Sequence, residues 1–226
     1  NAIKYGDAFR LGSHLLLCAD SRSKEMVAGL IGARKIKAVI TDPPYGVAYI
    51  GGTKDKLKIE NDDLDENALE EINKKWFDGV DFAVKPGGYV LATVPARPLH
   101  LIFALDWKRR GWLRQIMVWN KSALVLGHSE YHYKHELILF GWKPGGERLK
   151  NADRTKTTVW DFDKPSANRE HPTMKPVELF AYAINNHTKI GQTVYDPFLG
   201  SGTTMVAAHQ LNRKCYGMEI DPKYCQ

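Results

Sequence analysis

The sequence predicts a doubly wound α/β fold, in which one mixed sheet of seven strands carries helices on both faces. Short apolar runs rich in β-branched and aromatic residues alternate with longer amphipathic stretches along the chain. No internal repeat or low-complexity tract interrupts this alternation, which is typical of doubly wound sheets. With 226 residues, of which 43% are apolar and 26% charged, residues 1–226 fit one globular domain.

The expected elements follow in order along the chain. Apolar runs predict strands at residues 14–18, 37–41, 89–94, 115–120, 136–142, 193–195 and 214–219. Amphipathic stretches predict helices at residues 23–33, 64–84, 98–109, 176–188 and 203–211. Lys85-Pro86-Gly87-Gly88 is expected to end the second helix. We expect residues 47–63 to be a mobile loop that closes over a substrate, and residues 143–169 to be a long loop without its own element.

Composition disfavours several classes of protein. No run approaches the ~18 apolar residues of a membrane span, and no signal peptide opens the sequence, so we expect a cytoplasmic protein. Cys18, Cys215 and Cys225 form no Cys-x-x-Cys pair, which favours buried reduced thiols over disulfides or zinc ligands. The chain begins without Met and stops just after Asp221-Pro222, where a helix would normally follow. We therefore expect a fragment of a longer protein.

The charge distribution singles out one basic region. A net charge of +6 and a pI of 9.1 permit binding to a polyanion without requiring it. Residues 107–121 carry five basic side chains and no acid, whereas residues 54–71 carry three basic and eight acidic ones. The first region could face phosphates, although a solvated charged surface would give the same pattern.

Asp42-Pro43-Pro44-Tyr45 is the first stretch that indicates chemistry. It follows the apolar run 38–40, so its polar groups should emerge at the carboxyl end of a buried strand, where open α/β sheets bind their ligands. The two prolines lack backbone donors, which leaves carbonyls free to accept, and Asp42 adds a carboxylate. Tyr45 adds a flat ring. The stretch thus offers acceptors for an amino group and a stacking surface, although a strand-ending turn would also explain it.

A glycine-containing loop and a downstream acid form the second stretch. Residues 193–204 predict a strand, a tight turn at Gly200-Ser201-Gly202 and the start of a helix. The loop lacks the lysine of a phosphate-binding P-loop, and Met205 stands where a dinucleotide fingerprint would have glycine or alanine. Glu219 ends the next strand, where its carboxylate can accept from both ribose hydroxyls. This pattern favours a nucleoside-containing cofactor, although glycine turns also occur for packing reasons alone.

Three motifs in order resemble one known family. They are Asp42-Pro43-Pro44-Tyr45, His171-Pro172-Thr173-x-Lys175-Pro176 and Asp196-Pro197-Phe198-x-Gly200-Ser201-Gly202-Thr203-Thr204. Together they resemble the beta group of amino DNA methyltransferases, in which the catalytic motif precedes the cofactor loop. The resemblance spans nearly the whole chain, because Gly6-Asp7, residues 15–21, Trp119-Asn120-Lys121 and His135-Glu136 are also similar to that family.

The resemblance implies a Rossmann-like fold that depends on S-adenosylmethionine and has a permuted motif order. It implies that Asp42 and the Pro43 carbonyl accept both hydrogens of an exocyclic amino group and so orient its nitrogen toward the sulfonium methyl. The target base must leave the duplex, and Tyr45 is similar to the residue that stacks on it. The implied catalytic residues are Asp42, Pro43, Pro44 and Tyr45. The implied cofactor-binding residues are Asp20, Thr173, Lys175, Asp196, Pro197, Phe198, Gly200, Ser201, Gly202, Thr203, Thr204 and Glu219.

Double-stranded DNA is the partner that the resemblance implies, in the setting of restriction and modification. The segment 143–169 carries seven basic residues and is short for a specificity region, so it favours phosphate contact over base reading. We therefore expect short or relaxed sequence recognition, aided by a missing domain or by a second copy in a homodimer. The residues expected to contact DNA are Lys121, His135, Lys143, Arg148, Lys150, Arg154 and Lys156.

The target base and the reaction class leave alternatives open. Aspartate at position 42 favours adenine N6 over cytosine N4. A module that binds DNA or cofactor without turnover, and an oxidoreductase with a dinucleotide, are the alternatives from other classes. A metal site at His128, His132, His135 and Glu136 is disfavoured because methyl transfer needs no Lewis acid, so no metal is expected. Aromatic residues elsewhere are expected in the core, among them Trp76, Trp107 and Trp112.

Overall fold

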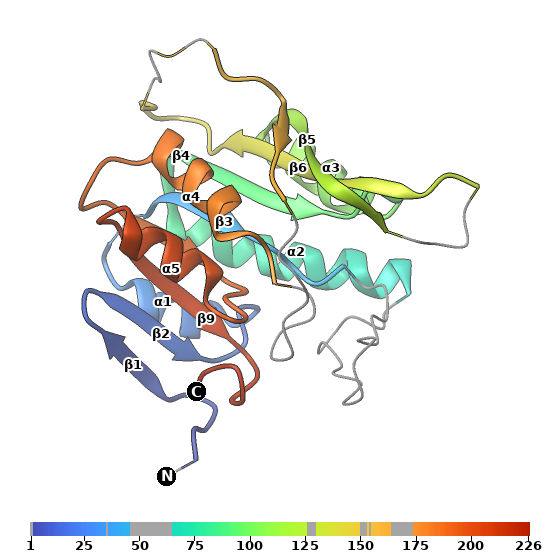
Figure 1. The fold of residues 1–226 in the computed structure, drawn as a ribbon. Helices are drawn as coiled ribbons and strands as arrows, with labels where there is room; N and C mark the ends of the chain where they lie inside the picture. The colour runs from blue at the N-terminus through green and yellow to red at the C-terminus, as the bar shows by residue number, and fades with distance from the viewer. Residues whose placement is uncertain are drawn as a thin grey trace.

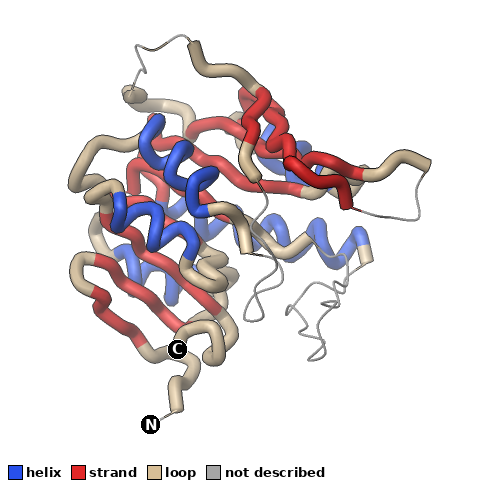
Figure 2. Tube along the Cα trace, viewed as in Figure 1, coloured by secondary structure: helices blue, strands red, loops and turns tan. Residues whose placement is uncertain are grey.

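The computed structural model describes residues 2–34, 36–45, 65–125, 130–149, 153, 155–163 and 174–226. Within these ranges nine strands form one mixed sheet in the order β1-β2-β9-β8-β3-β4-β6-β5-β7 (Figure 1). Helices lie on both faces of the sheet, as Figure 2 shows by its colours. The doubly wound α/β class is confirmed, whereas the expected count of seven strands is wrong. In the same ranges, no helix has the length and apolarity to cross a bilayer.

The strands include all seven runs that the sequence predicts, and two more. Their bounds are β1 Ala8–Leu11, β2 His14–Cys18, β3 Ile36–Thr41, β4 Val84–Val94, β5 Leu113–Val125, β6 Tyr133–Trp142, β7 Val159–Asp161, β8 Thr193–Asp196 and β9 Lys214–Glu219. The additional strands, β1 and β7, are the two outer strands and have four and three residues. Most of their side chains are exposed, so neither strand carries the apolar run that marks the four-residue β8.

One expectation about loops is wrong. The segment 143–169 does contain an element, because β7 pairs in parallel with β5 through Val118↔Val159 and Asn120↔Asp161. The second helix ends at Ala83, just before Lys85-Pro86-Gly87-Gly88, as expected. These residues lie in the first part of β4, where the Gly87 N–H donates to the Lys143 carbonyl over 2.8 Å. The expected mobile loop at residues 47–63 lies outside the described residues.

Within the described ranges five helices cover the sheet, three on one face and two on the other. Their bounds are α1 Lys24–Ile31, α2 Glu66–Ala83, α3 His100–Arg109, α4 Val177–His187 and α5 Thr203–Gln210. Side-chain caps begin two of them, since Ser23 accepts from the Met26 N–H and Asp65 from the Ala68 N–H. Helices α1, α2 and α3 share one apolar cluster with the sheet, and α4 and α5 share the other (Figure 1).

The core contains the residues that the sequence places there. Trp76, Trp107 and Trp112 are each no more than 2% exposed, which confirms their core assignment. The three cysteines are buried free thiols, also as expected. Phe77 packs edge-on against Trp107 with ring centroids 5.4 Å apart. This aromatic packing fixes α2 and α3 under the strands that carry the polar residues described below.

The register of β3 brings the two main sequence motifs together. β3 pairs in parallel with β4 on one side and with β8 on the other, through Ala38↔Val194 and Val39↔Tyr195. Parallel neighbours end at the same edge of a sheet, so Asp42, which follows β3, and Asp196, which ends β8, emerge side by side. The strand that leads into Asp42 and the strand that leads into the glycine loop are therefore direct neighbours in the sheet.

Candidate active site

Asp42 lies at the carboxyl edge of the sheet with its carboxylate already hydrogen-bonded. Its Oδ1 accepts from the Tyr45 hydroxyl over 2.8 Å and from the Thr93 hydroxyl near the end of β4. Its Oδ2 contacts the Lys175 ammonium over 2.9 Å. A carboxylate has roughly four lone-pair positions, so these three contacts leave one position on Oδ2 among the described groups. The Asp42 side chain is 26% exposed, which makes that position reachable.

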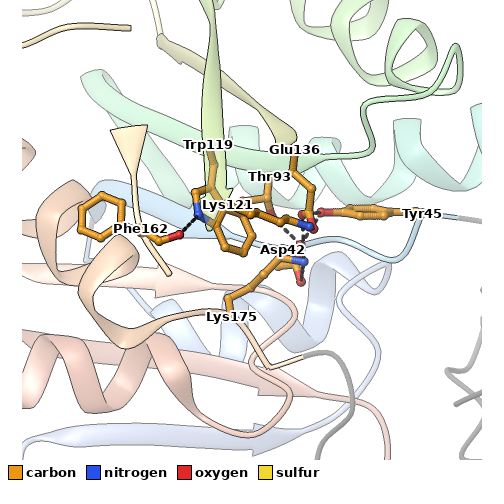
Figure 3. A network of polar contacts seen from close by, with 8 residues as sticks. All are labelled: Asp42, Tyr45, Thr93, Trp119, Lys121, Glu136, Phe162 and Lys175. Carbon is orange, nitrogen blue, oxygen red and sulfur yellow. Dashed lines mark hydrogen bonds and ion pairs between the residues drawn. The ribbon is translucent and has the colours of Figure 1, made fainter. Parts of the chain in front are cut away.

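Glu136 in β6 is the second carboxylate of the cluster. Its Oε2 lies 3.2 Å from the same Lys175 ammonium and accepts from the Tyr45 hydroxyl over 2.9 Å. Its Oε1 contacts the Lys121 ammonium of β5 over 2.5 Å. Figure 3 shows these side chains converging from separate segments of the chain. Two carboxylates and two ammonium groups thus form one cluster with no net charge.

Burial and pairing set the ionisation of the cluster. Burial alone would raise the pKa of Glu136, but Lys175 and Lys121 outweigh it and hold that pKa at about 2. Burial alone would lower the pKa of Lys175, but Asp42 and Glu136 outweigh it and raise that pKa above its ordinary value. Glu136 and Lys175 therefore stay charged at neutral pH, and each depends on the other for that charge.

Tyr45 connects the two carboxylates through its hydroxyl. Burial, together with the charges of Asp42 and Glu136, raises its pKa well above the ordinary value, so the phenol stays protonated. Its single proton faces two acceptors. The Lys175 ammonium lies 5.1 Å from the centroid of the Tyr45 ring, within the range of a cation–π contact. The ring is thereby held at the edge of the cluster (Figure 3).

An aromatic side chain and a cavity lie beside the cluster. The Trp119 indole donates to the Phe162 carbonyl over 2.8 Å, and the Lys121 ammonium lies 4.8 Å from the Trp119 ring centroid. A cavity of about 780 Å³ borders Lys121 and Lys175 and extends to the end of β7 and the start of α4. Its volume is sufficient for a ligand of nucleotide size.

Asp196 shapes the glycine loop from inside. Its carboxylate accepts from the Thr41 hydroxyl over 2.6 Å, from the Thr204 hydroxyl over 2.5 Å and from the Phe198 N–H over 3.0 Å. Burial raises its pKa to about 6 in spite of these donors. With three protein donors on a carboxylate that is 2% exposed, Asp196 mainly holds the loop and the start of α5 in place.

The loop has features that fit a nucleoside-containing cofactor. Glu219 is the last residue of β9, and its carboxylate accepts from the Gly200 N–H over 2.8 Å. Gly202 has φ of +88° and precedes α5, whose first turn has no side-chain cap. A Cβ on Gly217 would lie 2.6 Å from the Leu199 side chain, so the strand and loop approach closely. Backbone donors at a helix start beside an acid provide for both a charged and a hydroxyl-rich ligand.

The remaining residues expected at the cofactor lie around this loop, with two exceptions. Asp20 follows β2, which pairs with β9, and forms an ion pair with Arg22. Pro197, Ser201 and Thr203 belong to the loop and the first residue of α5. Lys175 differs, because its ammonium contacts the carboxylates of the catalytic cluster. Thr173 lies outside the described residues.

The residues expected to contact DNA are dispersed. Lys143 donates to the Asp81 carbonyl over 2.6 Å, and the Arg148 guanidinium lies 3.9 Å from the centroid of the Trp142 ring. Both residues lie near the start of β4, at the edge of the sheet opposite Asp42. Lys156 pairs with Asp153 before β7 begins. Lys121, also expected to contact DNA, has its ammonium buried against Glu136. His135 lies in β6 opposite Asn120, while Lys150 and Arg154 lie outside the described residues.

Three residues of the site were not assigned there from sequence. Thr93 lies in an apolar run with no polar pattern around it, and Thr41 precedes the catalytic motif as an ordinary strand residue. Glu136 was considered as a metal ligand, but its carboxylate is occupied by Lys121, Lys175 and Tyr45. In the described part of the chain, no cluster of three His, Cys, Asp or Glu side chains suits a metal. The sequence could have identified Glu136, because it follows His135 in a segment that resembles the family.

Comparison with known proteins agrees with this geometry. A family model described as DNA methylase, which groups N6 and N4 enzymes, matches residues 36–226. The chain belongs to this family. S-adenosylmethionine is the family's cofactor, as the sequence predicts, and a solved structure similar to this chain is the M1.HpyAVI–SAM complex. That complex is 25% identical, with a TM-score of 0.68 over 92% of this chain and 94% of its own.

Curated relatives include Type II methyltransferases of two bacteria. M.HpaI of Haemophilus parainfluenzae is 26% identical to this chain over 84% of the chain's residues. The chain spans 66% of the length of M.HpaI, just under two thirds. M2.DpnII of Streptococcus pneumoniae is 25% identical over 82% of the chain and 78% of its own length. The cytosine-N4-specific PvuII DNA methyltransferase shares the fold, with a TM-score of 0.75 at 16% identity over 98% of this chain and 87% of its own.

Proposed function

We propose that the chain transfers a methyl group from S-adenosylmethionine to the N6 amino group of an adenine extruded from duplex DNA. The observation that carries this proposal is the juxtaposition of two motifs at one sheet edge. Asp42 with its remaining acceptor position lies beside the glycine loop, and the Thr41–Asp196 hydrogen bond joins their strands over 2.6 Å. An amino group on Asp42 would thus be close to a cofactor held by that loop.

The residues of the cluster would orient and polarise the amino nitrogen. Bound S-adenosylmethionine supplies an electrophilic methyl group on a positively charged sulfur. Asp42 Oδ2 accepts one hydrogen of the amino group, and the carbonyl of Pro43 is the acceptor proposed for the other. The glycine loop and Glu219 would hold the cofactor, which would supply its methyl group to the nitrogen lone pair and keep the carbon–sulfur electron pair on sulfur. The nitrogen acquires the positive charge and loses one proton, for which Asp42 is the nearest described acceptor.

Tyr45 would support the extruded base. Its hydroxyl is anchored by two carboxylates, so its ring is held at the edge of the cluster, where a flat base could stack on it. Stacking of a base on an aromatic side chain contributes about 1–3 kcal/mol, which helps to offset the unstacking of the duplex. The ring needs no covalent bond to the base.

A second candidate is transfer to cytosine N4. The cytosine-N4-specific PvuII enzyme has the same fold, and both bases present an exocyclic amino group in similar surroundings. Aspartate at position 42 supports adenine, as argued from the sequence above. The two reactions would use the same residues and differ in the base that enters beside Tyr45.

The β5–β6 ribbon supports duplex DNA as the substrate. β4 pairs with β6 only as far as Leu137, so the residues beyond Asn120 in β5 pair with β6 alone and project from the sheet (Figure 1). The ribbon leaves Leu124 and Tyr131 exposed at 52% and 85%. A two-stranded ribbon has dimensions that fit the major groove. Because Lys121 and Glu136 lie at its base, a duplex along it would lie next to Asp42.

One assay tests the proposal directly. The protein is incubated with labelled S-adenosylmethionine and genomic DNA, the DNA is digested to nucleosides, and the labelled nucleoside is identified. Sequencing of the same DNA maps the modified positions. Labelled N6-methyldeoxyadenosine is the expected product. Labelled N4-methyldeoxycytidine would instead support the second candidate, and absence of label from DNA in the presence of bound cofactor would refute both.

A further inference from the structure

Lys175 is shared between two carboxylates that have different tasks. Its ammonium lies 2.9 Å from Asp42 Oδ2 and 3.2 Å from Glu136 Oε2, so a small shift exchanges one partner for the other. The Oδ2 atom it contacts is also the one with the remaining acceptor position. Glu136 is positioned as an alternative partner, because it approaches the lysine from a different strand and is fixed from behind by Lys121.

We propose that Lys175 is a latch on Asp42, and that Glu136 is the positioning residue that receives its ammonium when the target amino group binds. The inference rests on the proposed methyl transfer and adds a residue pair that controls access to it. In the resting protein the ammonium shares Asp42 with the hydroxyls of Tyr45 and Thr93. On arrival of the base, the amino group binds the remaining position of Oδ2 and the ammonium moves from the same oxygen onto Glu136.

Electrostatics gives the reason why such a shift is needed. During transfer the amino nitrogen becomes positively charged while it is hydrogen-bonded to Asp42. If Lys175 remained on the same oxygen, two positive charges would lie roughly 4 to 5 Å apart in a site with little water. Glu136 offers the ammonium an equivalent partner without any change in the total charge of the cluster. The lysine therefore need not leave for solvent, where a side chain that is 10% exposed has little room to go.

The different contacts of Lys121 and Lys175 make it possible to distinguish a latch on Asp42 from simple charge balance in the cluster. Lys121 contacts Glu136 on its other oxygen, and no contact joins it to Asp42 among the described residues. Lys121 and Lys175 contribute equally to the net charge, but only Lys175 places a positive charge on the oxygen that the amino group would bind. Two double variants, E136Q/K175M and E136Q/K121M, therefore have the same net charge in the cluster and different effects on the latch.

The test measures base extrusion and turnover in the whole chain. A duplex that keeps adenine at the modified position and carries 2-aminopurine as its neighbour reports extrusion of that adenine by fluorescence, and labelled cofactor reports turnover on the same duplex. In E136Q the ammonium remains on Asp42, so we expect both readouts to fall on the order of 10- to 100-fold, the worth of one charge-assisted contact. E136Q/K175M should recover to within about threefold of the wild type, whereas E136Q/K121M should stay low.

Controls keep each outcome interpretable. Thermal unfolding and cofactor titration show whether each variant is folded, and Glu70→Gln removes a carboxylate from an exposed ion pair with Arg109 as a matched substitution. If E136Q fails to fold, K175M alone decides, and the latch predicts extrusion at or above the wild-type level. Equal recovery in both double variants, wild-type behaviour of E136Q, or loss of extrusion in K175M would overturn the latch. A wild-type chain that modifies no DNA would overturn the proposed function as well.

Discussion

The Thr41 hydroxyl donates to the Asp196 carboxylate over 2.6 Å, and this hydrogen bond joins the ends of two strands that are 155 residues apart in sequence. Thr41 directly precedes Asp42, and Asp196 directly precedes the glycine loop. The bond therefore sets the distance between the acceptor of an amino group and the loop that would hold the methyl donor. The predictions below test the residues on either side of it.

Replacing Asp42 should separate transfer from cofactor binding. Asp42→Ala removes the acceptor for the amino hydrogen, and we expect turnover to fall at least about 100-fold, comparable to the loss of one catalytic hydrogen-bonding group. Cofactor affinity, measured by calorimetry, should stay within about threefold, because the loop is held by other residues. Asp81→Ala, near the end of α2 and at the edge of the sheet opposite Asp42, is the matched control. Retention of turnover in Asp42→Ala would refute the catalytic role.

Two substitutions of Tyr45 should separate the contribution of its ring to turnover from that of its hydroxyl. Tyr45→Phe keeps the stacking surface and loses the hydrogen bonds to Asp42 and Glu136, so we expect a moderate loss of turnover, about 10-fold. Tyr45→Ala also loses the ring, and with it about 1–3 kcal/mol of stacking energy with the extruded base. Fluorescence of 2-aminopurine at the target position measures base extrusion in both. Equal losses in the two variants would argue against stacking.

Gly217 tests the close approach between β9 and the glycine loop. A Cβ at this position would lie 2.6 Å from Leu199, whose N–H is held by the Met218 carbonyl over 2.8 Å. We expect Gly217→Ala to destabilise the fold by about 1–3 kcal/mol and to weaken cofactor binding, because Leu199 must shift within the loop. Gly29→Ala is the control, since nothing lies within 4 Å of its added Cβ. Unchanged cofactor affinity in Gly217→Ala would contradict this prediction, because it would mean that Leu199 can shift without disturbing the cofactor loop.

Asp196 should make stability depend on pH in the opposite direction from an ordinary paired carboxylate. Its pKa is about 6 in the fold against an ordinary 3.8, so the folded state binds more protons and stability falls as pH rises between about 4 and 6. The difference corresponds to roughly 3 kcal/mol as an upper estimate. Asp196→Asn cannot ionise, so its melting temperature relative to wild type should rise from pH 4.5 to pH 7.5. A constant difference across that range would contradict the raised pKa.

The sequence was informative where the physical signal is local. Apolar runs predicted seven of the nine described strands, and proline and glycine at the ends of two of them marked both halves of the site. Contacts between distant segments carry no such signal. The position of Lys175 against Glu136 depends on how β6 and the start of α4 meet, and the burial of Lys121 depends on which face of β5 it occupies. Lys143 and Arg148 follow β6 to the opposite edge because that strand runs antiparallel to β4.

The sheet ends in very short strands on both sides, β1 with four residues and β7 with three. Unpaired backbone groups at the rim of a sheet are a template for edge-to-edge association, and short outer strands limit how many such groups are offered. A second copy of this chain would therefore gain little by extending the sheet. We expect any self-association to use helical or ribbon surfaces, and the chain to resist the cross-strand aggregation to which long exposed edges are prone.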